Sequence, residues 1–499
     1  MNFIIKYGLA LLLLSFYSCE SWLNVTPSDR LSEEMLFNDR EGFVKALNGV
    51  YIELNTNELY GRNLTAGALD VMGQYYSVAS SSHAFYNYGG LVYTGNDEKA
   101  LFDNMWQKCY AVIACCNTII EKCDENKAGL SPVWKGSIKG EALALRAMLH
   151  FDMLRLFGPL TSELDKESIP YQTNSDQTVT PLLSGSEVIG LILDDLKNAV
   201  GLLKDTDPYF VEEEFSDTDL NYRRFRMNYF AAKGLMARVQ LWGGDKEKAA
   251  ATAKEVIAEG QAEGAEFFPF VTNSEATSSN PDRVFYSEVL FGTYHSSREK
   301  LHEDLFAPTL ESTSILTLAG TARRDDLYDN ENDYRYSVWS TYNKNGTSVL
   351  YHRKFEKQDN VTASRQYMIP LIRMSEMYLI AVECCKLDEA SVYLNTFRNA
   401  RNCNSLALTE DNRINILANE YKKEMLGEGQ LFFFYKRQEM VNIPDGNQAT
   451  GTKNVELAKY VVPLPESETD QRISSTPDFV NVSPKNHLQI MGRYVDVVS

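Results

Sequence analysis

The chain has 499 residues, of which 44% are hydrophobic and 23% are charged. This is enough material for a large core, although one helical superstructure can be as long as several ordinary domains. Asp and Glu (68) outnumber Lys and Arg (49), which gives a formal net charge of -19. Because such a surface repels phosphate backbones, we expect no nucleic-acid partner.

The first 18 residues have the pattern of a signal peptide. Lys6 precedes an apolar run at 9–14, which is far shorter than the roughly 20 residues needed to cross a bilayer. Cys19 directly follows the small residue Ser18, and this order resembles a bacterial lipobox, in which the cysteine is acylated. We therefore predict a lipoprotein signal peptide over 1–18 and a lipid anchor at Cys19. The alternative is an ordinary secreted protein that is cut nearby.

Apolar positions then recur with a helical period in several segments. They predict helices over 104–121, 140–157 and 186–203, and the second of these is apolar on two faces. It should therefore be packed on two sides. Gly158-Pro159 marks its expected end, because proline cannot continue a helix.

Two further segments predict helical hairpins. In 227–260, a helix rich in small residues turns at 243–245 (Gly-Gly-Asp) into a second helix. A helix over 371–385 is likewise followed by a short turn and a helix over 390–401. A hairpin of about 34 residues has the length of a tetratricopeptide repeat, which must stack on its copies to bury its faces. With the pair in 100–157, three or four hairpins predict a mainly α, tetratricopeptide-like scaffold.

The cysteines and histidines do not predict a metal site. Cys109, Cys116 and Cys123 recur every seven residues and thus share one helical face, which is typical of small core residues. Zinc would require closer pairs or histidines to complete four ligands, and the six histidines are spread singly. His150 is predicted to lie in a helix core or on its face. We expect no cofactor, and the sequence leaves open whether structural calcium assists.

Two long polar segments, 63–98 and 272–366, separate the predicted hairpins. They are too rich in Gly, Ser, Asn and Tyr for helix and too long for simple connectors, and large loops on a rigid scaffold commonly bind ligands. Their rings suit a carbohydrate, whose C–H faces pack on aromatic planes while polar groups bind its hydroxyls. The alternative is that many of these rings are buried under the loops. The predicted ligand-binding residues are Asp70, Tyr75, Tyr76, Tyr86, Tyr88, Arg335, Tyr336, Trp339 and Tyr342.

Catalytic motifs are missing from the sequence. It has no P-loop, G-x-G-x-x-G, G-x-S-x-G or H-E-x-x-H pattern. Asp325-Asp326 could serve a glycosidase only if two carboxylates stood at a fixed separation across a sugar. We therefore predict a binding protein and keep a glycan-degrading enzyme as an alternative.

Several motifs occur in the order in which a known family has them. They are the helix with its Phe-Gly-Pro end at 140–159, the paired helices at 373–398, the Glu-rich helix at 420–429 and the extended segment at 460–465. Over almost the whole chain this order resembles the SusD/RagB family, nutrient-binding lipoproteins of the bacterial outer membrane. Departures such as Leu160, which stands where the family usually has proline, concern the scaffold.

The resemblance implies one SusD-like domain over 19–499 with a helical scaffold and an irregular ligand-binding face. It also implies an outer-membrane protein, exposed at the cell surface, that docks as a lid on a SusC-like TonB-dependent transporter. Such a protein captures an oligosaccharide, or less often a peptide, and passes it to the transporter. The family's ligand residues vary, so none can be carried over to a position here. A protein that merely assembles other envelope proteins is a further alternative.

Overall fold

The structure is a computed structural model that describes residues 33–176 and 179–474. The predicted signal peptide and the predicted anchor at Cys19 lie outside the described residues. No helix in the described part of the chain is both long enough and apolar enough to cross a membrane.

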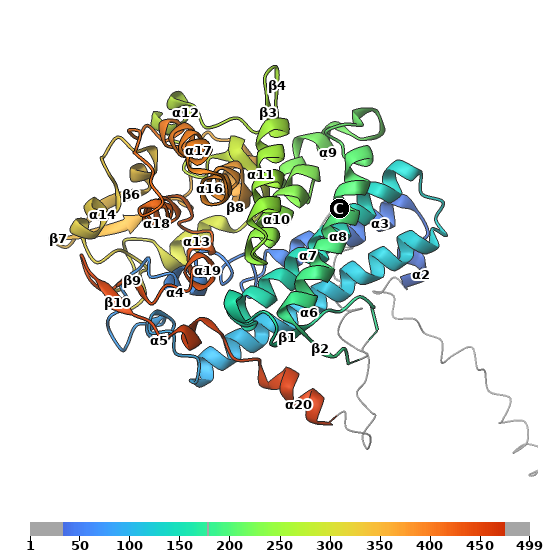
Figure 1. Cartoon of the computed structure of the whole chain (residues 1–499), viewed down its shortest axis with the longest axis horizontal. Helices are drawn as coiled ribbons and strands as arrows, with labels where there is room; N and C mark the ends of the chain where they lie inside the picture. The colour runs from blue at the N-terminus through green and yellow to red at the C-terminus, as the bar shows by residue number, and fades with distance from the viewer. Residues whose placement is uncertain (1–32, 177–178, 475–499) are drawn as a thin grey trace, which may run out of the picture.

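Long helices form the scaffold of the molecule (Figure 1). In chain order they are α3 (Arg40–Leu54), α6 (Asn96–Glu125), α7 (Pro132–Phe157), α8 (Gly185–Thr206), α10 (Tyr229–Trp242), α11 (Lys246–Gly260), α16 (Met374–Cys384), α17 (Leu387–Ala400) and α18 (Arg413–Glu424). Neighbours in the series α6, α7, α8, α10, α11, α16 and α17 pack against one another. The hairpins therefore form one continuous stack, as the tetratricopeptide-like prediction requires.

Shorter helices fill the spaces around this stack. They are α2 (Glu33–Leu36), α4 (Ala68–Met72), α5 (Tyr86–Gly89), α9 (Asp217–Asn221), α12 (Asn273–Thr277), α13 (Arg298–Leu305), α14 (Thr321–Leu327), α15 (Ala363–Tyr367), α19 (Gln430–Arg437) and α20 (Glu466–Ser474). The 3-10 helices are η2 (Thr161–Glu163), η3 (Glu212–Glu214), η4 (Arg223–Phe225), η5 (Tyr286–Glu288), η6 (Tyr334–Val338) and η7 (Leu457–Tyr460).

The strands of the described residues form five two-stranded antiparallel sheets. The pairs are β1 (Glu167–Pro170) with β2 (Leu182–Ser184), β3 (Gln261–Ala262) with β4 (Ala265–Glu266), β5 (Val289–Tyr294) with β8 (Met368–Arg373), β6 (Trp339–Lys344) with β7 (Thr347–His352), and β9 (Asn442–Pro444) with β10 (Thr452–Asn454). The hairpin of β6 and β7 lies at the left edge of Figure 1.

One hydrophobic core runs through the molecule, from Leu36 near the start of the described chain to Val462 near its end. Helix α7 lies inside it, and almost every side chain from Gly136 to Phe157 is buried. This confirms the predicted packing on two sides. The helix ends at Phe157, as predicted, and the buried ammonium of Lys436 donates to the carbonyl of Gly158 at 2.7 Å. The end of α7 is thus capped by a side chain that lies 278 residues away.

The predicted turn between α10 and α11 is confirmed. Gly244 has a φ of +82°, a left-handed conformation that glycine adopts without a Cβ clash. The carboxylate of Asp245 accepts from the amide of Lys248 at 3.0 Å and so caps α11. The three-residue turn 243–245 therefore ends α10 at Trp242 and starts α11 at Lys246.

Two predictions about secondary structure are wrong. Residues 371–373, predicted as the start of a helix, are the end of strand β8, and the helix begins only at Met374. The cause is non-local, because β8 pairs with β5 through partners such as Val289 and Arg373. The segments 63–98 and 272–366 were predicted to be without helix, yet they contain several short helices.

The predicted core role of the cysteines is confirmed. Cys109, Cys116 and Cys123 are fully buried, and none forms a disulfide with another cysteine of the described residues. Burial raises the pKa of the Cys123 thiol to about 12. His150 is also fully buried, and its ring stacks on Tyr171 with centroids 4.0 Å apart.

Candidate functional site

The two long polar segments of the sequence meet on one side of the molecule. Residues 309–317 of the second segment, called here the bridging segment, contact the first segment. The amide of Ser77 donates to the carbonyl of Thr317 at 2.7 Å, and the amide of Ala84 donates to that of Thr313 at 3.2 Å. The first polar segment is thus bonded to the middle of the second.

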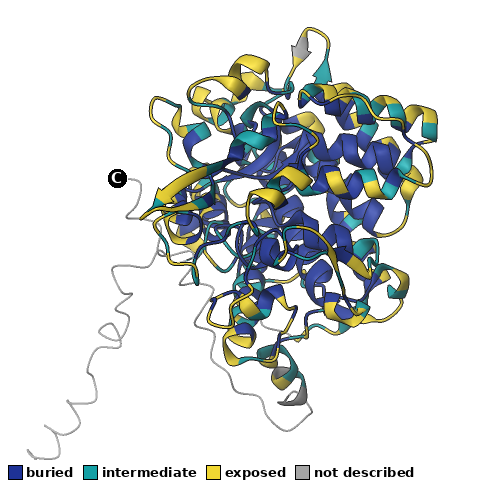
Figure 2. Cartoon of the chain, turned by 90° about the vertical axis from the view of Figure 1, so that its left-hand side faces the viewer, coloured by how far each residue is buried: buried dark blue, intermediate teal, exposed yellow. Residues whose placement is uncertain are grey.

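The bridging segment is also bonded to the hairpin of β6 and β7. The ammonium of Lys344 donates to the carbonyl of Leu310 at 2.9 Å, and the hydroxyl of Thr317 donates to that of Leu350 at 2.6 Å. Helix α5 and the hairpin therefore flank one segment. Figure 2 looks onto this side of the molecule and shows exposed loops and strands over a buried interior.

Three of the predicted ligand-binding rings reach solvent. Tyr86, at the start of α5, and Tyr342, on β6, are each 44% exposed. Tyr336 is half-buried, and the guanidinium of Arg324 lies 4.6 Å from its ring centroid. Tyr86 and Tyr342 can contact a ligand without any rearrangement, because aromatic faces at the surface are free to stack.

Tyr351 lies on the same side of the hairpin as Tyr342. In the β6–β7 register, Tyr342 faces Val349 and Ser340 faces Tyr351, so the two tyrosines occupy diagonal positions on one face of the ladder. Tyr351 is half-buried. It belongs to the second polar segment but was not among the predicted ligand residues. Only the strand register reveals its alignment with Tyr342.

Asp70 is fully buried and forms part of the scaffold. Its carboxylate accepts from the amides of Gly427 and Gly429 at 2.6 and 2.9 Å, and from the hydroxyl of Tyr76 at 3.2 Å. Burial raises the pKa of Asp70 to about 7, against the two amides, which lower it. The residue fixes the turn between α18 and α19.

Tyr75, Tyr76 and Tyr88 are also buried, with exposed fractions of 3%, 1% and 4%. The hydroxyl of Tyr75 donates to the carbonyl of Tyr421, far along the chain. Burial is the main cause that raises the pKa of Tyr88 above its ordinary value. In this conformation the three rings hold the first polar segment against the scaffold, as the alternative interpretation of the sequence anticipated.

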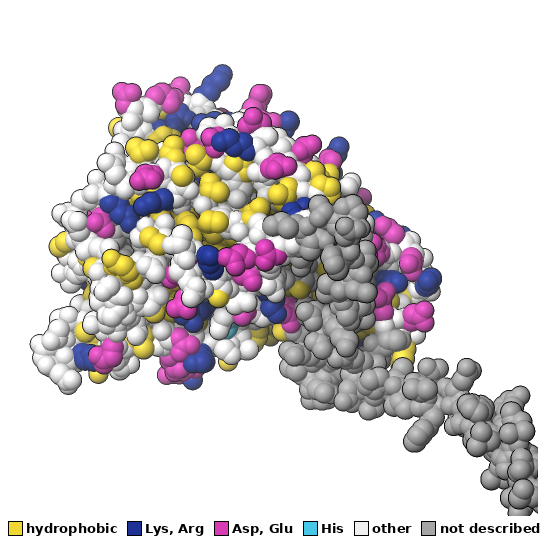
Figure 3. Space-filling model, turned by 90° about the horizontal axis from the view of Figure 1, so that it is seen from below, with side chains coloured by type: hydrophobic (Ala, Val, Ile, Leu, Met, Phe, Trp, Pro, Cys, Tyr) yellow, Lys and Arg dark blue, Asp and Glu magenta, His cyan; other side chains and the backbone are white. Residues whose placement is uncertain are grey.

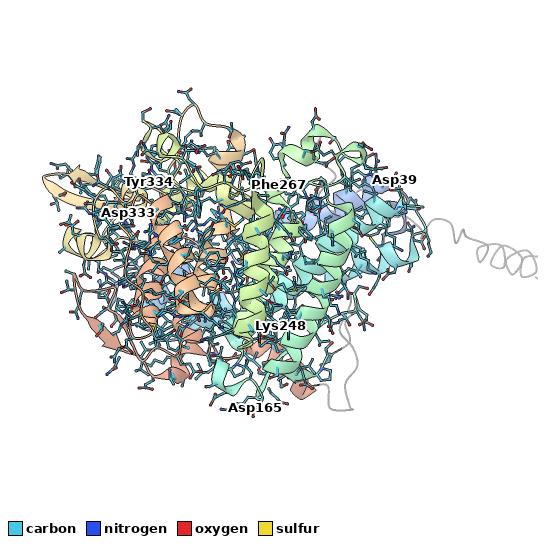
Figure 4. All side chains as sticks on the ribbon, turned by 45° about the horizontal axis from the view of Figure 1, so that its top comes forward. Asp39, Asp165, Lys248, Phe267, Asp333 and Tyr334 are labelled. Atoms are coloured by element: carbon cyan, nitrogen blue, oxygen red, sulfur yellow. The ribbon has the colours of Figure 1, made fainter. Side chains whose placement is uncertain are left out.

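Arg335 belongs to a buried ion-pair network. Its guanidinium donates to Asp333 at 2.7 Å and to Glu420 at 2.9 Å, and its exposed fraction is 2%. Burial alone would raise the pKa of Glu420, but Arg335 and Lys423 outweigh it and lower that pKa. Asp333 lies on the left side of the molecule in Figure 4.

The network continues along one face of α18. Glu424 accepts from Arg335 at 3.2 Å and from Arg401 at 2.6 Å, and it also pairs with Arg373. All four side chains are buried. Such a network stabilises the fold only when every charged group in it is paired. Arg335 therefore anchors segment 272–366 to α18. We call this segment, together with 63–98, the irregular side of the molecule.

Trp339 is 5% exposed, and its indole N–H donates to the hydroxyl of Tyr328 at 3.3 Å. It lies on the inner face of the hairpin opposite His352. Of the nine predicted ligand residues, six are thus buried. The other three are the exposed Tyr86 and Tyr342 and the half-buried Tyr336.

Two cavities lie away from these rings. One of about 30 Å³ is lined by Arg155, Glu376 and neighbouring side chains. A groove of about 670 Å³ lies between α6, α7 and α8, with Arg146 and Asp195 on its lining. Neither contains a predicted ligand residue. Within residues 33–176 and 179–474, no three His, Cys, Asp or Glu side chains are grouped to hold a metal.

Comparisons with known proteins agree with this architecture. A family model described as "Starch-binding associating with outer membrane" matches residues 21–241, and one described as "SusD family" matches residues 280–477. "SusD-like protein P2" of Formosa agariphila is 22% identical, and the match covers 95% of this chain and 98% of that protein.

Solved structures share the fold. A SusD-like carbohydrate binding protein from Bacteroides vulgatus has a TM-score of 0.67 at 20% identity and covers 89% of this chain and 99% of its own. A laminarin binding SusD-like protein has a TM-score of 0.61 at 16% identity, covering 87% and 97%. Surface glycan-binding protein A from Bacteroides uniformis has a TM-score of 0.63 at 17% identity, covering 86% and 97%. The stacked hairpins, the irregular side and both family matches together establish that this chain belongs to the SusD/RagB family.

Proposed function

We propose that this protein binds glycans on the outer surface of a bacterial outer membrane and delivers them to a SusC-like TonB-dependent transporter. The observation that carries the proposal is the pair of outward tyrosines, Tyr86 and Tyr342, on two elements that flank the bridging segment. Rings held on a rigid frame can stack on a sugar at low entropic cost. The protein is proposed to bind without catalysing a reaction.

Relatives support the glycan as ligand. Two of the similar solved structures are those of a laminarin binding protein and of a surface glycan-binding protein. Peptide capture by the same scaffold is the second candidate, since half-buried tyrosines beside polar loops also suit an extended peptide. Peptides that co-purify with the protein while sugars do not would favour it.

The location and the partner are proposed on different grounds. One matching family is described as associating with the outer membrane. A lipid anchor at Cys19, after removal of 1–18, and a single domain over 19–499 complete the proposal. On the underside of the molecule, apolar side chains gather over the middle of the face (Figure 3). Apolar side chains gathered on a surface often mark a protein interaction site, and this face is a candidate surface for the transporter.

Calorimetric titration against a panel of neutral and acidic glycans tests the ligand. We expect Tyr342→Ala and Tyr86→Ala each to weaken binding of the best ligand by about tenfold, because loss of a stacked ring costs roughly 1–2 kcal/mol.

Phe210→Ala is the matched control, because Phe210 is 43% exposed and lies after α8 in the helical half. It should bind like the unsubstituted protein, and circular dichroism should show that all three variants keep the native fold. Full binding by both tyrosine variants would refute the proposed site. If the unsubstituted protein bound no glycan of the panel, the proposed ligand would be refuted.

A further inference from the structure

Four arginines and a histidine from separate segments come together next to the hairpin of β6 and β7. Arg283 precedes η5, Arg298 and His302 lie on α13, Arg353 directly follows β7, and Arg365 lies on α15. The amide of Arg353 donates to the carbonyl of Val338, which fixes it at the base of the hairpin. We call these five residues the cationic cluster.

The cationic cluster holds more positive than negative charge. Within the described residues, the carboxylates within 4 Å of its guanidiniums are those of Glu356 and Asp282: Glu356 lies 2.6 Å from Arg353 and 3.6 Å from Arg283, and Asp282 lies 3.8 Å from Arg365. Four arginines against two acids leave two positive charges, in a chain whose net charge is -19. The carboxylate of Asp282 moreover accepts from the backbone amides of Val284, Phe285 and Tyr286.

Several buried nitrogens of the cluster have no hydrogen-bond partner among the described residues. Within the described residues, the buried Nε atoms of Arg283 and Arg298 and the buried Nδ1 atom of His302 form no hydrogen bond. Arg283 is 7% exposed and His302 is 8% exposed. A buried donor that stays unpaired is costly, because it has lost its water without gaining a partner. This cost points to an acceptor that joins the site.

Protonation behaviour agrees with an excess of positive charge. Burial and the neighbouring arginines lower the pKa of Arg298 to about 9 and that of Arg283 to about 10. Burial also lowers the pKa of His302 to about 4, with a further contribution from Arg283. A bound anion would reverse these shifts, because a nearby negative charge favours the protonated form.

The cluster opens onto the tyrosine face of the hairpin. The side chain of Arg353 is 33% exposed. Because its amide bonds the carbonyl of Val338, the ladder continues one residue beyond β7, and alternation places Arg353 on the same side as Tyr351 and Tyr342. The ring of His302 lies 6.5 Å from that of Tyr351. A ligand stacked on the tyrosines would therefore extend toward the guanidiniums.

We infer that the cationic cluster, through Arg353, Arg283 and His302, binds the anionic group of an acidic glycan, either a sulfate ester or a uronic-acid carboxylate, whose sugar ring lies on Tyr342 and Tyr351. The inference rests on the proposed glycan function and narrows its substrate class. Guanidinium groups suit both anions, because their fork of N–H donors matches two oxygens. Glu356 already bridges Arg353 and Arg283, so it occupies part of the place that the ligand anion would share.

This arrangement predicts opposite effects for two neighbours. Arg353→Gln should weaken binding of acidic glycans about tenfold, because it removes a charge-assisted hydrogen bond. Glu356→Gln should strengthen the same binding severalfold, because it removes a competing carboxylate. The probes are the full chain in detergent with dextran sulfate against dextran, and with polygalacturonate against fully methyl-esterified pectin. These pairs separate sulfate from carboxylate and each anion from its neutral backbone.

Arg40→Gln and Glu41→Gln are the controls, since both residues are exposed on α3 and make the same changes in net charge. They should not alter binding. The inference is overturned if the Arg353 and Glu356 variants bind the acidic glycans as these controls do. Binding of a neutral glycan that depends on Tyr342 but not on Arg353 would likewise overturn it and leave the proposed function standing. If no glycan of either kind binds, both fail.

Discussion

The helical stack and the irregular side are both well buried and both contain buried ion pairs, such as Arg146 with Asp195 in the stack, but they satisfy their backbone groups differently. In the stack, helices such as α7 satisfy their own backbone and bury apolar side chains along nearly their whole length. On the irregular side, short elements depend on side chains that reach across the chain, such as Asp70 to Gly427 and Arg335 to Glu420. The fold of the irregular side thus depends on paired polar groups as much as on apolar contacts.

Breaking the ion-pair network should have the largest effect. Glu424→Gln leaves Arg335, Arg373 and Arg401 without a shared carboxylate in the interior, and removal of one partner from a buried ion pair costs about 3–5 kcal/mol. Urea unfolding followed by circular dichroism measures the loss. Glu41→Gln, which breaks the exposed pair with Lys45, should leave the unfolding midpoint unchanged. Equal midpoints for the two variants would show that the network does not stabilise the irregular side.

Acid should weaken the same network next. Because the folded-state pKa of Glu420 is lowered, its stabilisation is complete above the ordinary glutamate pKa of roughly 4.3 and is lost as the pH falls below it. Glu420→Gln removes this titration, so the stability gap between the variant and the unsubstituted protein should narrow from pH 6 to pH 3. A gap that stayed constant over this range would contradict the lowered pKa.

The smallest effect is expected in the helical stack. Ser184 caps α8, and its hydroxyl and the Glu187 carboxylate each bond the other's backbone amide. Ser184→Ala should cost about 1 kcal/mol, because one amide of the first turn loses its acceptor. Thermal unfolding measures this, and Ser186→Ala, which removes an exposed hydrogen bond to the carbonyl of Leu164 but no helix cap, serves as a neighbouring control. A loss as large as that of Glu424→Gln would mean that local caps matter as much as the distant ion pairs.

Features that depend on near neighbours could be predicted from the sequence. The turn at Gly244 and Asp245, the end of α7 at Phe157 and the buried face of Cys109 all follow from local spacing. Strand β8 could not be predicted this way, because its partner β5 lies about 80 residues earlier and its apolar run continues into α16.

The candidate site was predicted in composition but only partly in position. Clustered tyrosines identified the correct segments, but exposure depends on which face of an element meets the core, and this separates Tyr342 from Trp339 three residues earlier. The cationic cluster could not be predicted, because Arg283, Arg298 and Arg353 are dispersed over 70 residues and only the fold brings them together.

The bridging segment has a consequence for how specificity could diversify in such proteins. Since it is bonded to the chain before Tyr86 on one side and to the hairpin of Tyr342 on the other, its length sets the gap between the two rings. Adding or deleting a residue there would move one ring relative to the other while leaving the helical stack intact. Relatives could thus be tuned to saccharides of different repeat length by small insertions at this single place.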